Sequence, residues 1–379
     1  MLENYVKKIL SSRVYELAQE TPLTPAPLLS RRLGAQVFLK REDLQPVYSF
    51  KLRGAYNKIS QLSDAQKAAG VITASAGNHA QGVAMASTRL GIKAIIVMGR
   101  NTPSIKINAV KDRGAKVILH GDNYDEASIH AKQLCEEQGL TFIPPYDDAE
   151  VIAGQGTIGL EIVNQHNGPI DAIFIPVGGG GLLAGVAAYV KHLHPKTQII
   201  GVEVEGSNCM DAALRAGKRV KLPLETLDLF ADGVSVAQAG LLPFKIARKY
   251  VDGIVVVNVD EICAAIKDVF EDTRGVSEPA GALAIAGMKR YLADHPGLSS
   301  VVAIVSGANV NFDRLRHISE RAELGEAREA VLAVTIDEAQ GSFLRFCRAL
   351  GKRSITEFNY RYADTTGAHI YVGLGVASK

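Results

Sequence analysis

The sequence predicts an α/β protein with parallel sheets covered by helices, and three observations support this. From about residue 71, short apolar runs alternate with helical patterns, which is typical of βαβ units. The chain has 379 residues, 47% of them hydrophobic, which is enough for roughly two or three domains. Four consecutive glycines, Gly178 to Gly181, separate an apolar run from a helical stretch. Turns of this kind, at the carboxyl ends of strands, are where open α/β sheets bind ligands.

The first series of elements lies between residues 71 and 143. Short apolar runs predict strands at 71–73, 94–98, 116–119 and 140–143. Between them, apolar residues at helical spacing predict helices at 78–90, 103–112 and 125–138. We expect this series to form a small domain spanning residues 46–145.

A second series follows the loop at Pro144–Pro145. Its predicted strands are 173–177, 199–204, 254–257 and 301–305, and its predicted helices are 155–165, 182–191, 208–216, 260–272 and 280–292. We expect a large domain made of residues 1–45 and 146–325. The active site is then expected in a cleft at the carboxyl ends of the strands.

The C-terminal residues change character. An Arg- and Glu-rich connector at 319–329 precedes a predicted strand at 330–336, a helix at 342–350 and strands at 355–362 and 368–374. This βαββ pattern predicts a small appended module over residues 326–379.

Composition excludes several classes of function. The net charge of +2 and the lack of a basic aromatic stretch argue against nucleic acid and membrane partners. The four cysteines lie far apart without metal-ligand spacing, so neither disulfides nor metal sites are expected. Residues 172–190 carry no charge, but Pro176 and the glycines predict a buried strand, loop and helix. The N-terminus is too short and too charged for a signal peptide, so a cytoplasmic protein is expected.

The glycine loop predicts an anion site, because its N–H groups lie at a helix N-terminus and no Cβ blocks close approach. A Walker A loop is excluded, since Leu182 follows where a lysine would stand. A dinucleotide fingerprint fits Gly179, Gly181 and Ala184. From this loop alone, NAD, another phosphate and a turn without a ligand remain open.

A second motif, Ser49 to Ala55, opens a helix with a lysine in its first turn. The positive end of the helix dipole disfavours the charge of Lys51. Three nearby cations are expected to disfavour it further: Lys40, Arg41 and Arg53. A lysine with a depressed pKa suits Schiff-base chemistry, and the alternative is an ordinary solvated lysine.

Two further motifs follow predicted strands. Ser75-Ala76-Gly77-Asn78-His79 opens a helix, and its N–H groups with the side chains of Ser75 and Asn78 are suited to a carboxylate or a ring hydroxyl. His79 is a candidate general base, although a histidine in this position is more often structural. Ser306 to Asn309 follows the strand 301–305 directly.

Together these motifs resemble those of fold-type II pyridoxal-phosphate enzymes, which share the fold of tryptophan synthase β, and specifically those of biosynthetic threonine dehydratases. The resemblance covers residues from about 20 to 325. It rests on Lys40–Asp43, Ser49–Ala55, Ser75–Gly82, Gly178–Leu182, Glu278–Ala282 and Ser306–Asn309. A dinucleotide site would explain only one of these motifs, so the NAD alternative is abandoned. The resemblance implies two doubly wound parallel-sheet domains and pyridoxal 5'-phosphate as the cofactor.

The resemblance also implies a role for each motif. Lys51 forms the Schiff base, the loop Gly178-Gly179-Gly180-Gly181-Leu182 holds the cofactor phosphate, and Phe50 packs beside the ring. Asn78 lies against the ring 3-oxygen, Ser306 bonds the ring nitrogen, and Glu278 lies near the cofactor. The residues expected to bind the substrate are Ser75, Ala76, Gly77, Asn78 and His79.

The implied reaction converts L-threonine to 2-oxobutanoate and ammonia, and L-serine to pyruvate, at the first step of isoleucine biosynthesis. A serine hydroxyl at the ring nitrogen makes a weaker electron sink than a carboxylate, which favours elimination. The alternatives are a serine racemase or catabolic dehydratase, and a catalytically silent amino-acid-sensing subunit. Ala76 disfavours a racemase, because that family uses a serine there, and Lys51 disfavours a silent subunit.

The appended module resembles the start of the ACT-like regulatory region of biosynthetic threonine dehydratases, in which isoleucine and valine are effectors. A full unit would read βαββαβ, whereas this chain ends at Lys379 after βαββ. We therefore expect weak isoleucine inhibition or none. An open sheet edge also favours self-association, so we expect a homo-oligomer, either a dimer or a tetramer.

Overall fold

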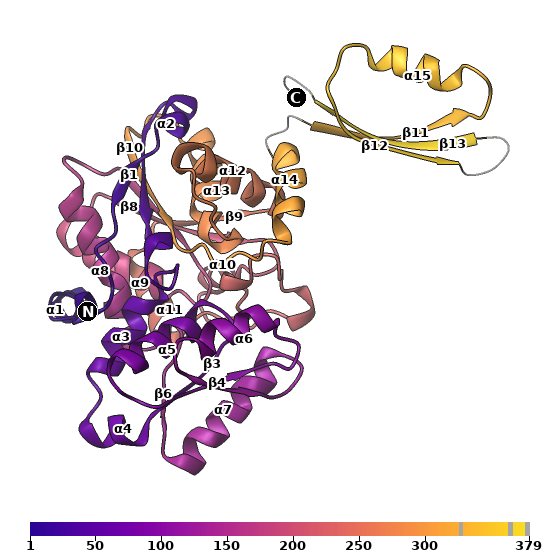
Figure 1. Ribbon diagram of the computed structural model, residues 1–379. Helices are drawn as coiled ribbons and strands as arrows, with labels where there is room; N and C mark the ends of the chain where they lie inside the picture. Colours follow the sequence, from indigo (N-terminus) through magenta and orange to yellow (C-terminus); the bar gives the residue numbers. More distant parts are fainter. Residues whose placement is uncertain (326–328, 363–366, 376–379) are drawn as a thin grey trace.

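The computed structural model describes residues 1–325, 329–362 and 367–375. The described residues contain three sheets. Two of them are each formed by one continuous segment, and the six-stranded sheet combines strands from residues 1–45 and 146–325. We propose that these segments are the domains expected from the sequence. Below, residues 46–145 are called the small lobe, residues 1–45 and 146–325 the large lobe, and residues 326–379 the C-terminal module. In Figure 1 the small lobe lies beneath the large lobe, and the module projects beyond α14.

The large lobe is built on a six-stranded sheet with the order β1-β2-β10-β7-β8-β9. All neighbouring strands are parallel except β1, which is antiparallel to β2. The strands are β1 (Leu23–Pro25), β2 (Gln36–Arg41), β7 (Ala172–Pro176), β8 (Gln198–Val204), β9 (Gly253–Val257) and β10 (Ser300–Val305). The inner strands β7, β8 and β10 are mainly apolar and almost fully buried, as parallel strands between two helical layers must be, whereas the edge strands β1 and β9 are only partly buried.

Helices cover both faces of this sheet. The side chains of one face pack in a core with α2 (Pro27–Leu33), α12 (Val259–Thr273), α13 (Pro279–Asp294) and α14 (Arg314–Gly325). Those of the other face pack with α8 (Ala149–Gln165), α9 (Gly181–Leu193), α10 (Cys209–Ala216) and α11 (Leu241–Tyr250), beside which lies α1 (Leu2–Leu10). The predicted uncharged segment 172–190 is confirmed as a buried strand, loop and helix. No helix among the described residues is long and apolar enough to cross a bilayer.

The small lobe is built on a four-stranded parallel sheet with the order β5-β4-β3-β6. Its strands are β3 (Val71–Ala74), β4 (Ala94–Met98), β5 (Lys116–Leu119) and β6 (Thr141–Phe142). One face packs against α3 (Lys51–Ser60), α5 (Asn78–Arg89) and α6 (Ser104–Lys111), and the other against α7 (Tyr124–Gln138). A short helix, α4 (Asp64–Ala69), joins α3 to β3.

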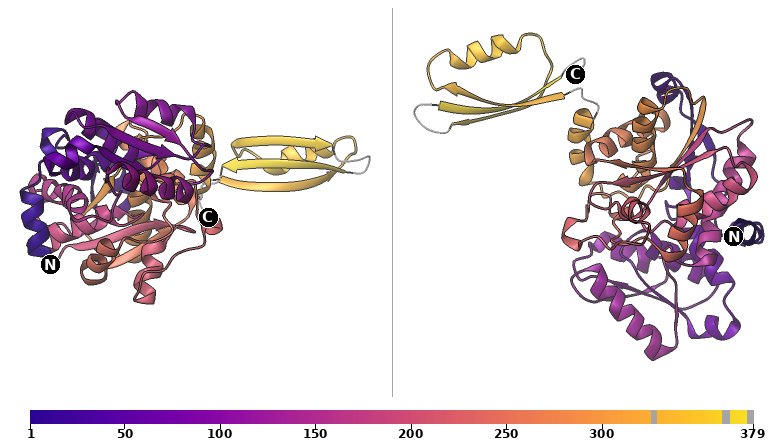
Figure 2. Two further views of the ribbon diagram at one scale, coloured as in Figure 1. Left: turned by 90° about the horizontal axis from the view of Figure 1, so that it is seen from below. Right: turned by 180° about the vertical axis from the view of Figure 1, so that it is seen from behind.

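The C-terminal module is an antiparallel sheet with the order β11-β13-β12 and one helix on its face. Its elements are β11 (Glu329–Asp337), α15 (Ser342–Leu350), β12 (Ile355–Tyr362) and β13 (Gly367–Gly375). The predicted βαββ order is confirmed, and Figure 2 shows the module apart from the lobes in two further views.

The expected connector at 319–329 differs from the structure, because its first part lies in α14. Ile318 and Ala322 of α14 are buried in the large-lobe core, and Arg321 Nε lies 2.5 Å from Asp260 Oδ1 of α12. Charged residues on the outer face of this helix made the segment resemble a linker. Only its buried face, spaced at helical intervals, distinguishes it.

Candidate active site

Lys51 is the first residue of α3, and α3 packs between α5 of the small lobe and α8 of the large lobe. Its Nζ lies 3.3 Å from the carbonyl oxygen of Pro145 and 5.1 Å from the centre of the Phe50 ring. Burial lowers the pKa of Lys51 to about 8, and the Glu278 carboxylate opposes this shift. The neutral amine is therefore accessible near neutral pH, as a lysine nucleophile requires.

The expected contribution of nearby cations to this low pKa is wrong, because burial is its cause. Each of the three cations is paired with at least one carboxylate, and Lys40 and Arg53 share Glu161. The pairs are Lys40–Glu161, Arg41–Asp43, Arg53–Glu42 and Arg53–Glu161. The paired carboxylates offset the positive charges of these three residues, which therefore have little effect on the pKa of Lys51. The pairings of Lys40 and Arg53 join residues far apart in the chain and could not be predicted from the sequence.

The loop Ser75 to Asn78 joins the end of β3 to the first turn of α5. The N–H of Gly77 donates to Ser75 Oγ over 3.2 Å. A Cβ added at Gly77 would meet no atom within 4 Å, so free space lies beside the loop. The first turn of α5 has no side-chain cap. The uncapped N–H groups of this turn are suited to a carboxylate, as the sequence predicts for the loop.

His79 is buried, and its Nε2 lies 2.9 Å from the carbonyl oxygen of Ile143. Burial lowers the pKa of His79 to about 3, and the charge of Lys51 adds to the effect. The imidazole is therefore neutral at physiological pH and committed to a backbone group. His79 is therefore better suited to a structural role than to that of a general base, and only its backbone N–H is available to contact a substrate.

Glu278, Asn78 and Asn309 form a hydrogen-bonded chain beside Lys51. Asn78 Nδ2 donates to Glu278 Oε1 over 2.6 Å, and Asn309 Nδ2 donates to Asn78 Oδ1 over 2.7 Å. Burial, together with the charge of Asp232, raises the pKa of Glu278 to about 7. The chain fixes the Asn78 amide and places a carboxyl group that titrates near neutrality within the site. Asn309 is the last residue of the motif Ser306–Asn309, but its hydrogen bond to Asn78 was not predicted from the sequence.

Ser306 follows β10 and lies buried at its carboxyl end. Its Oγ donates to the carbonyl oxygen of Ala280 over 3.2 Å. Its own carbonyl oxygen accepts the N–H of Phe50 over 3.2 Å, next to Lys51. A further bridge joins Ser49 to Gly307. The end of β10 and the start of α3 are thus held together, although 255 residues separate Lys51 from Ser306.

The glycine loop packs against backbone and side chains that leave no room for a Cβ. A Cβ on Gly179 would lie 2.3 Å from the Tyr146 ring, and one on Gly178 would lie 3.0 Å from Val234 Cα. Gly180 has φ +92°, a left-handed conformation that favours glycine. Tyr146 follows Pro145, whose carbonyl oxygen contacts Lys51 Nζ. The loop and the lysine, far apart in sequence, therefore meet across Pro145–Tyr146. No role for Tyr146 was predicted from the sequence.

These residues suit pyridoxal phosphate. No described side chain caps the first turn of α9, so its N–H groups are available to phosphate oxygens. Lys51, with its lowered pKa, suits the aldehyde, and the Ser306 hydroxyl suits a ring nitrogen. Among the residues that the structure describes, no cluster of His, Cys, Asp or Glu could hold a metal ion.

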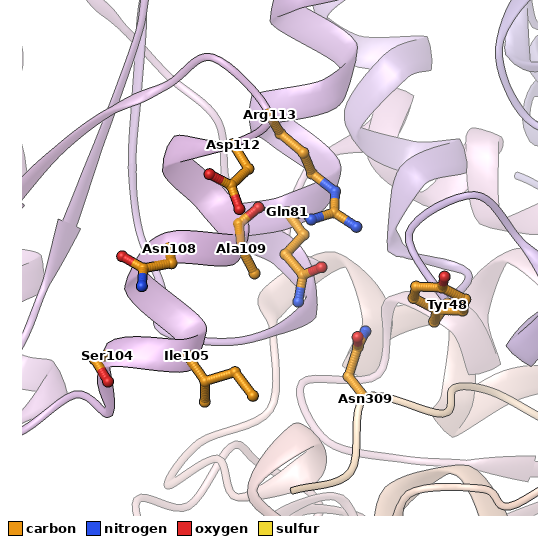
Figure 3. A pocket seen from close by; sticks show the side chains of 9 residues that line it. All are labelled: Tyr48, Gln81, Ser104, Ile105, Asn108, Ala109, Asp112, Arg113 and Asn309. Carbon is orange, nitrogen blue, oxygen red and sulfur yellow. Dashed lines mark hydrogen bonds between the residues drawn. The ribbon is translucent and has the colours of Figure 1, made fainter.

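A cavity of about 510 Å³ opens beside this site, at the boundary between the lobes. Figure 3 shows α6 along one side and Tyr48 and Asn309 opposite. The lining residues are Tyr48, Gln81, Ser104, Ile105, Asn108, Ala109, Asp112, Arg113 and Asn309. Asn309 also bonds Asn78, so the cavity adjoins the Asn78–Glu278 end of the site.

The chain belongs to the family of pyridoxal-phosphate dependent enzymes, whose model matches residues 14–307. Residues 320–379 match the C-terminal regulatory domain of threonine dehydratase. The predicted fold class, with its ACT-like module, and the predicted cofactor are confirmed at the level of the family.

Individual relatives narrow the comparison to threonine dehydratases. An L-threonine dehydratase biosynthetic IlvA from Burkholderia multivorans is 56% identical over 378 residues, which cover 98% of this chain and 74% of the relative. The structure of a processed threonine deaminase isoform 2 from Solanum lycopersicum has a TM-score of 0.83 at 52% identity, covering 85% of this chain and 93% of that one. A serine racemase from Dictyostelium discoideum is less similar, with a TM-score of 0.76 at 33% identity, covering 82% and 99%.

Proposed function

We propose that this chain is a threonine dehydratase that converts L-threonine to 2-oxobutanoate and ammonia, and L-serine to pyruvate and ammonia. This reaction is the first step of isoleucine biosynthesis. The observation that carries the proposal is the position of Lys51, a lysine of lowered pKa joined to the glycine loop through Pro145–Tyr146. The similarity to biosynthetic threonine dehydratases over nearly the whole chain supports the substrate.

Each site residue then has a proposed task. When bound, pyridoxal phosphate supplies an electron sink for the bonds that break at the substrate. The N–H groups of Gly178 to Leu182 hold its phosphate, Lys51 Nζ binds it, and Phe50 packs beside its ring. Released from the cofactor, the Lys51 amine removes the proton from the substrate Cα, and its lowered pKa keeps part of it neutral for this step.

The substrate is held from the small-lobe side. The N–H groups of Ser75 to His79 bind its carboxylate, and the open space at Gly77 admits it. Asn78, held by Glu278 and Asn309, faces the cofactor ring, and Ser306 supplies a hydroxyl to the ring nitrogen. Glu278 titrates near neutrality and is therefore suited to hold a proton beside the reacting groups.

The alternative activities receive less support. A racemase needs a second acid or base on the opposite face of Cα, and the methyl group of Ala76 cannot transfer a proton. A silent sensing subunit would have no need of Lys51. The higher identity to threonine dehydratases than to serine racemase favours dehydration as well.

The variant Lys51→Ala tests the proposal. It is expected to lose 2-oxobutanoate formation from L-threonine and to lose the visible absorbance of the lysine-bound cofactor. Lys58→Ala is the matched control, because Lys58 lies on the same helix and pairs with Asp148 over 2.7 Å, away from the site. Turnover by Lys51→Ala within about tenfold of the wild type would refute the assignment.

We propose in addition that the C-terminal module binds an amino-acid effector, isoleucine or valine. The match of residues 320–379 to the regulatory domain of threonine dehydratase supports this. Calorimetric titration of isoleucine into Lys51→Ala would detect a site apart from the catalytic lysine, and L-alanine serves as the control ligand. Absence of isoleucine binding would contradict the proposal. Initial rates of the wild type across the same isoleucine range test the expectation from the sequence, which is weak isoleucine inhibition or none.

We also propose that the chain forms a homo-oligomer. Apolar side chains are exposed together on the module, where Phe343 packs edge-on against Phe358 and Tyr360. Sedimentation velocity of the wild type and of Phe343→Ser tests this, and a monomeric wild type would refute it.

A further inference from the structure

The helix α6 of the small lobe is tied to the large lobe by an ion pair. Lys106 Nζ lies 2.6 Å from Asp232 Oδ2, and their side chains are 23% and 43% exposed. Lys106 lies in the first turn of α6, whereas Asp232 begins the short helix η4 (Asp232–Val234) of the large lobe. The two residues are 126 positions apart in the chain, so this pair reports on how the lobes are placed.

The helix η4 contacts three parts of the active site. The backbone of Val234 packs on Gly178 of the glycine loop, where a Cβ would lie 3.0 Å from Val234 Cα. Gly233 packs on Ala280, where the corresponding distance is 2.9 Å. The same Cβ position lies 3.8 Å from Asn78 Nδ2 and from Glu278 Oε1. A displacement of η4 at Asp232 would therefore change the packing of the residues around the cofactor site.

One partner of this ion pair, Lys106, lies on the helix that lines the cavity beside the site. The cavity is lined on one side by α6, including Ile105, the neighbour of Lys106. Tyr48 and Asn309 line the opposite side. Tyr48 belongs to the small lobe and Asn309 to the large lobe, so the distance between α6 and Asn309 contributes to the width of this opening.

We propose that the Lys106–Asp232 pair is an interlobe latch that holds α6 over the opening to the active site and positions η4 against Glu278. Both residues are positioning residues, and neither touches the reacting atoms. The proposal rests on the proposed function only for its kinetic consequences, because the lobe contact and its effect on Glu278 exist without turnover.

The latch has an electrostatic signature at Glu278. The groups that face this carboxyl are Asn78 from α5, the backbone of Asn309, Lys51 from α3, Asp232 from η4 and Lys106 from α6. The charge of Asp232 raises the pKa of Glu278, and the charge of Lys106 lowers it. Removing Lys106 must therefore raise this pKa, whereas removing the charge of Asp232 must lower it.

The test compares Lys106→Gln with Asp232→Asn in the holoenzyme. Opening the latch is expected to raise KM for L-threonine roughly two- to fivefold in both variants, the range of a partly exposed ion pair. The pKa of Glu278 is expected to move by about half a unit, upward in Lys106→Gln and downward in Asp232→Asn. Infrared titration of the carboxyl band reads this pKa directly, with Glu278→Gln identifying the band.

Hydrogen exchange of residues 104–111 gives a readout that needs no activity. It is expected to be faster in both variants and to return to the wild-type rate in Lys106→Arg, which keeps the charge. The matched control is Lys221→Gln, because Lys221 and Asp125 also face each other across the lobes, at 3.9 Å and with side chains 61% and 45% exposed. This control is expected to change neither the exchange of α6 nor the Glu278 titration.

The outcomes separate the two proposals. If the wild type fails to turn over threonine, the proposed function fails, while the infrared and exchange measurements still test the latch. Shifts of the Glu278 pKa in the same direction in both variants, or unchanged exchange of α6, would overturn the latch.

Discussion

Replacing Arg53 with methionine should destabilise the folded chain more than any loss of a surface charge. Arg53 is fully buried, and its guanidinium lies between the carboxylates of Glu42 and Glu161. It makes two hydrogen bonds to each carboxylate, at 2.8 and 2.8 Å and at 2.5 and 2.9 Å. Lys40 completes the cluster at 2.6 Å from Glu161. Two cations and two anions therefore balance in the interior.

The variant leaves Lys40 to balance both carboxylates, so one buried negative charge remains without a partner. Breaking a buried pair in this way costs about 3–5 kcal/mol. For a chain of this size, that loss corresponds to a fall in Tm of about 4–6 °C. Arg316→Met is the matched control, because Arg316 pairs with Glu320 over 2.8 Å on the surface. Its Tm should remain close to that of the wild type.

The pH dependence provides the sharper test. Burial alone would raise the pKa of Glu42, but the contact with Arg53 outweighs burial and holds the pKa below its usual range. In the wild type, Glu42 therefore contributes stability above the unfolded pKa of about 4.3 and loses it on acidification. In Arg53→Met, burial is unopposed, so Glu42 takes up a proton more readily in the folded state. The difference in Tm between the two proteins should then be largest at pH 7 and shrink toward about pH 5. A difference that stays constant or grows on acidification would refute this reasoning.

Three further predictions follow from single residues. The stability of His79→Gln should fall less steeply on acidification than that of the wild type. The wild-type imidazole has a pKa of about 3 in the folded chain and an ordinary pKa of 6.5, so the unfolded chain binds the proton first. Thermal melts between those two pH values test this prediction. Ala76→Ser should produce D-serine from L-serine, measured by chiral chromatography, and a wild type that racemises as fast as it dehydrates would contradict the argument from Ala76. Gly179→Ala should weaken cofactor binding and cost about 1–3 kcal/mol of stability, because its Cβ would lie 2.3 Å from the Tyr146 ring. Equilibrium dialysis measures the cofactor affinity, and melting curves measure the stability. Unchanged affinity and stability would show that the ring moves freely.

The sequence predicted the elements whose signal is local. The strands of both sheets beyond residue 71 are apolar runs bounded by turn residues, and they lie within a few residues of their predicted places. The predicted start of α8, at residue 155, was six residues too late, because the sequence signal for its true start at Ala149 is a single capping side chain, Asp148. Asp148 Oδ1 accepts the N–H groups of Glu150 and Val151 and begins the helix at Ala149.

Strand pairings and ion pairs between distant parts of the chain could not be predicted from the sequence. The strand β2 ends in Lys40 and Arg41, whose charges hid a largely buried strand next to β10 in the sheet. Their partners lie on other elements or around a turn, so the cations near Lys51 were taken as unpaired. The motifs of the site were found because each follows a strand locally. The roles of Asn309, Tyr146 and Asp232 depend on contacts made only in the folded chain.

Close backbone contacts explain how two distant motifs keep a fixed geometry. The glycine loop leads into the N-terminus of α9, and Lys51 is at the N-terminus of α3, with α8 between these helices. A Cβ on Gly185 of α9 would lie 2.4 Å from the Ile152 carbonyl oxygen of α8, and one on Gly154 of α8 would lie 2.7 Å from the Arg53 carbonyl oxygen of α3. Backbone thus packs on backbone from the loop to the lysine, without flexible side chains between them. An added methyl group at either glycine must therefore separate the helices and displace the amine from the phosphate-binding N–H groups, even though neither glycine touches the cofactor site.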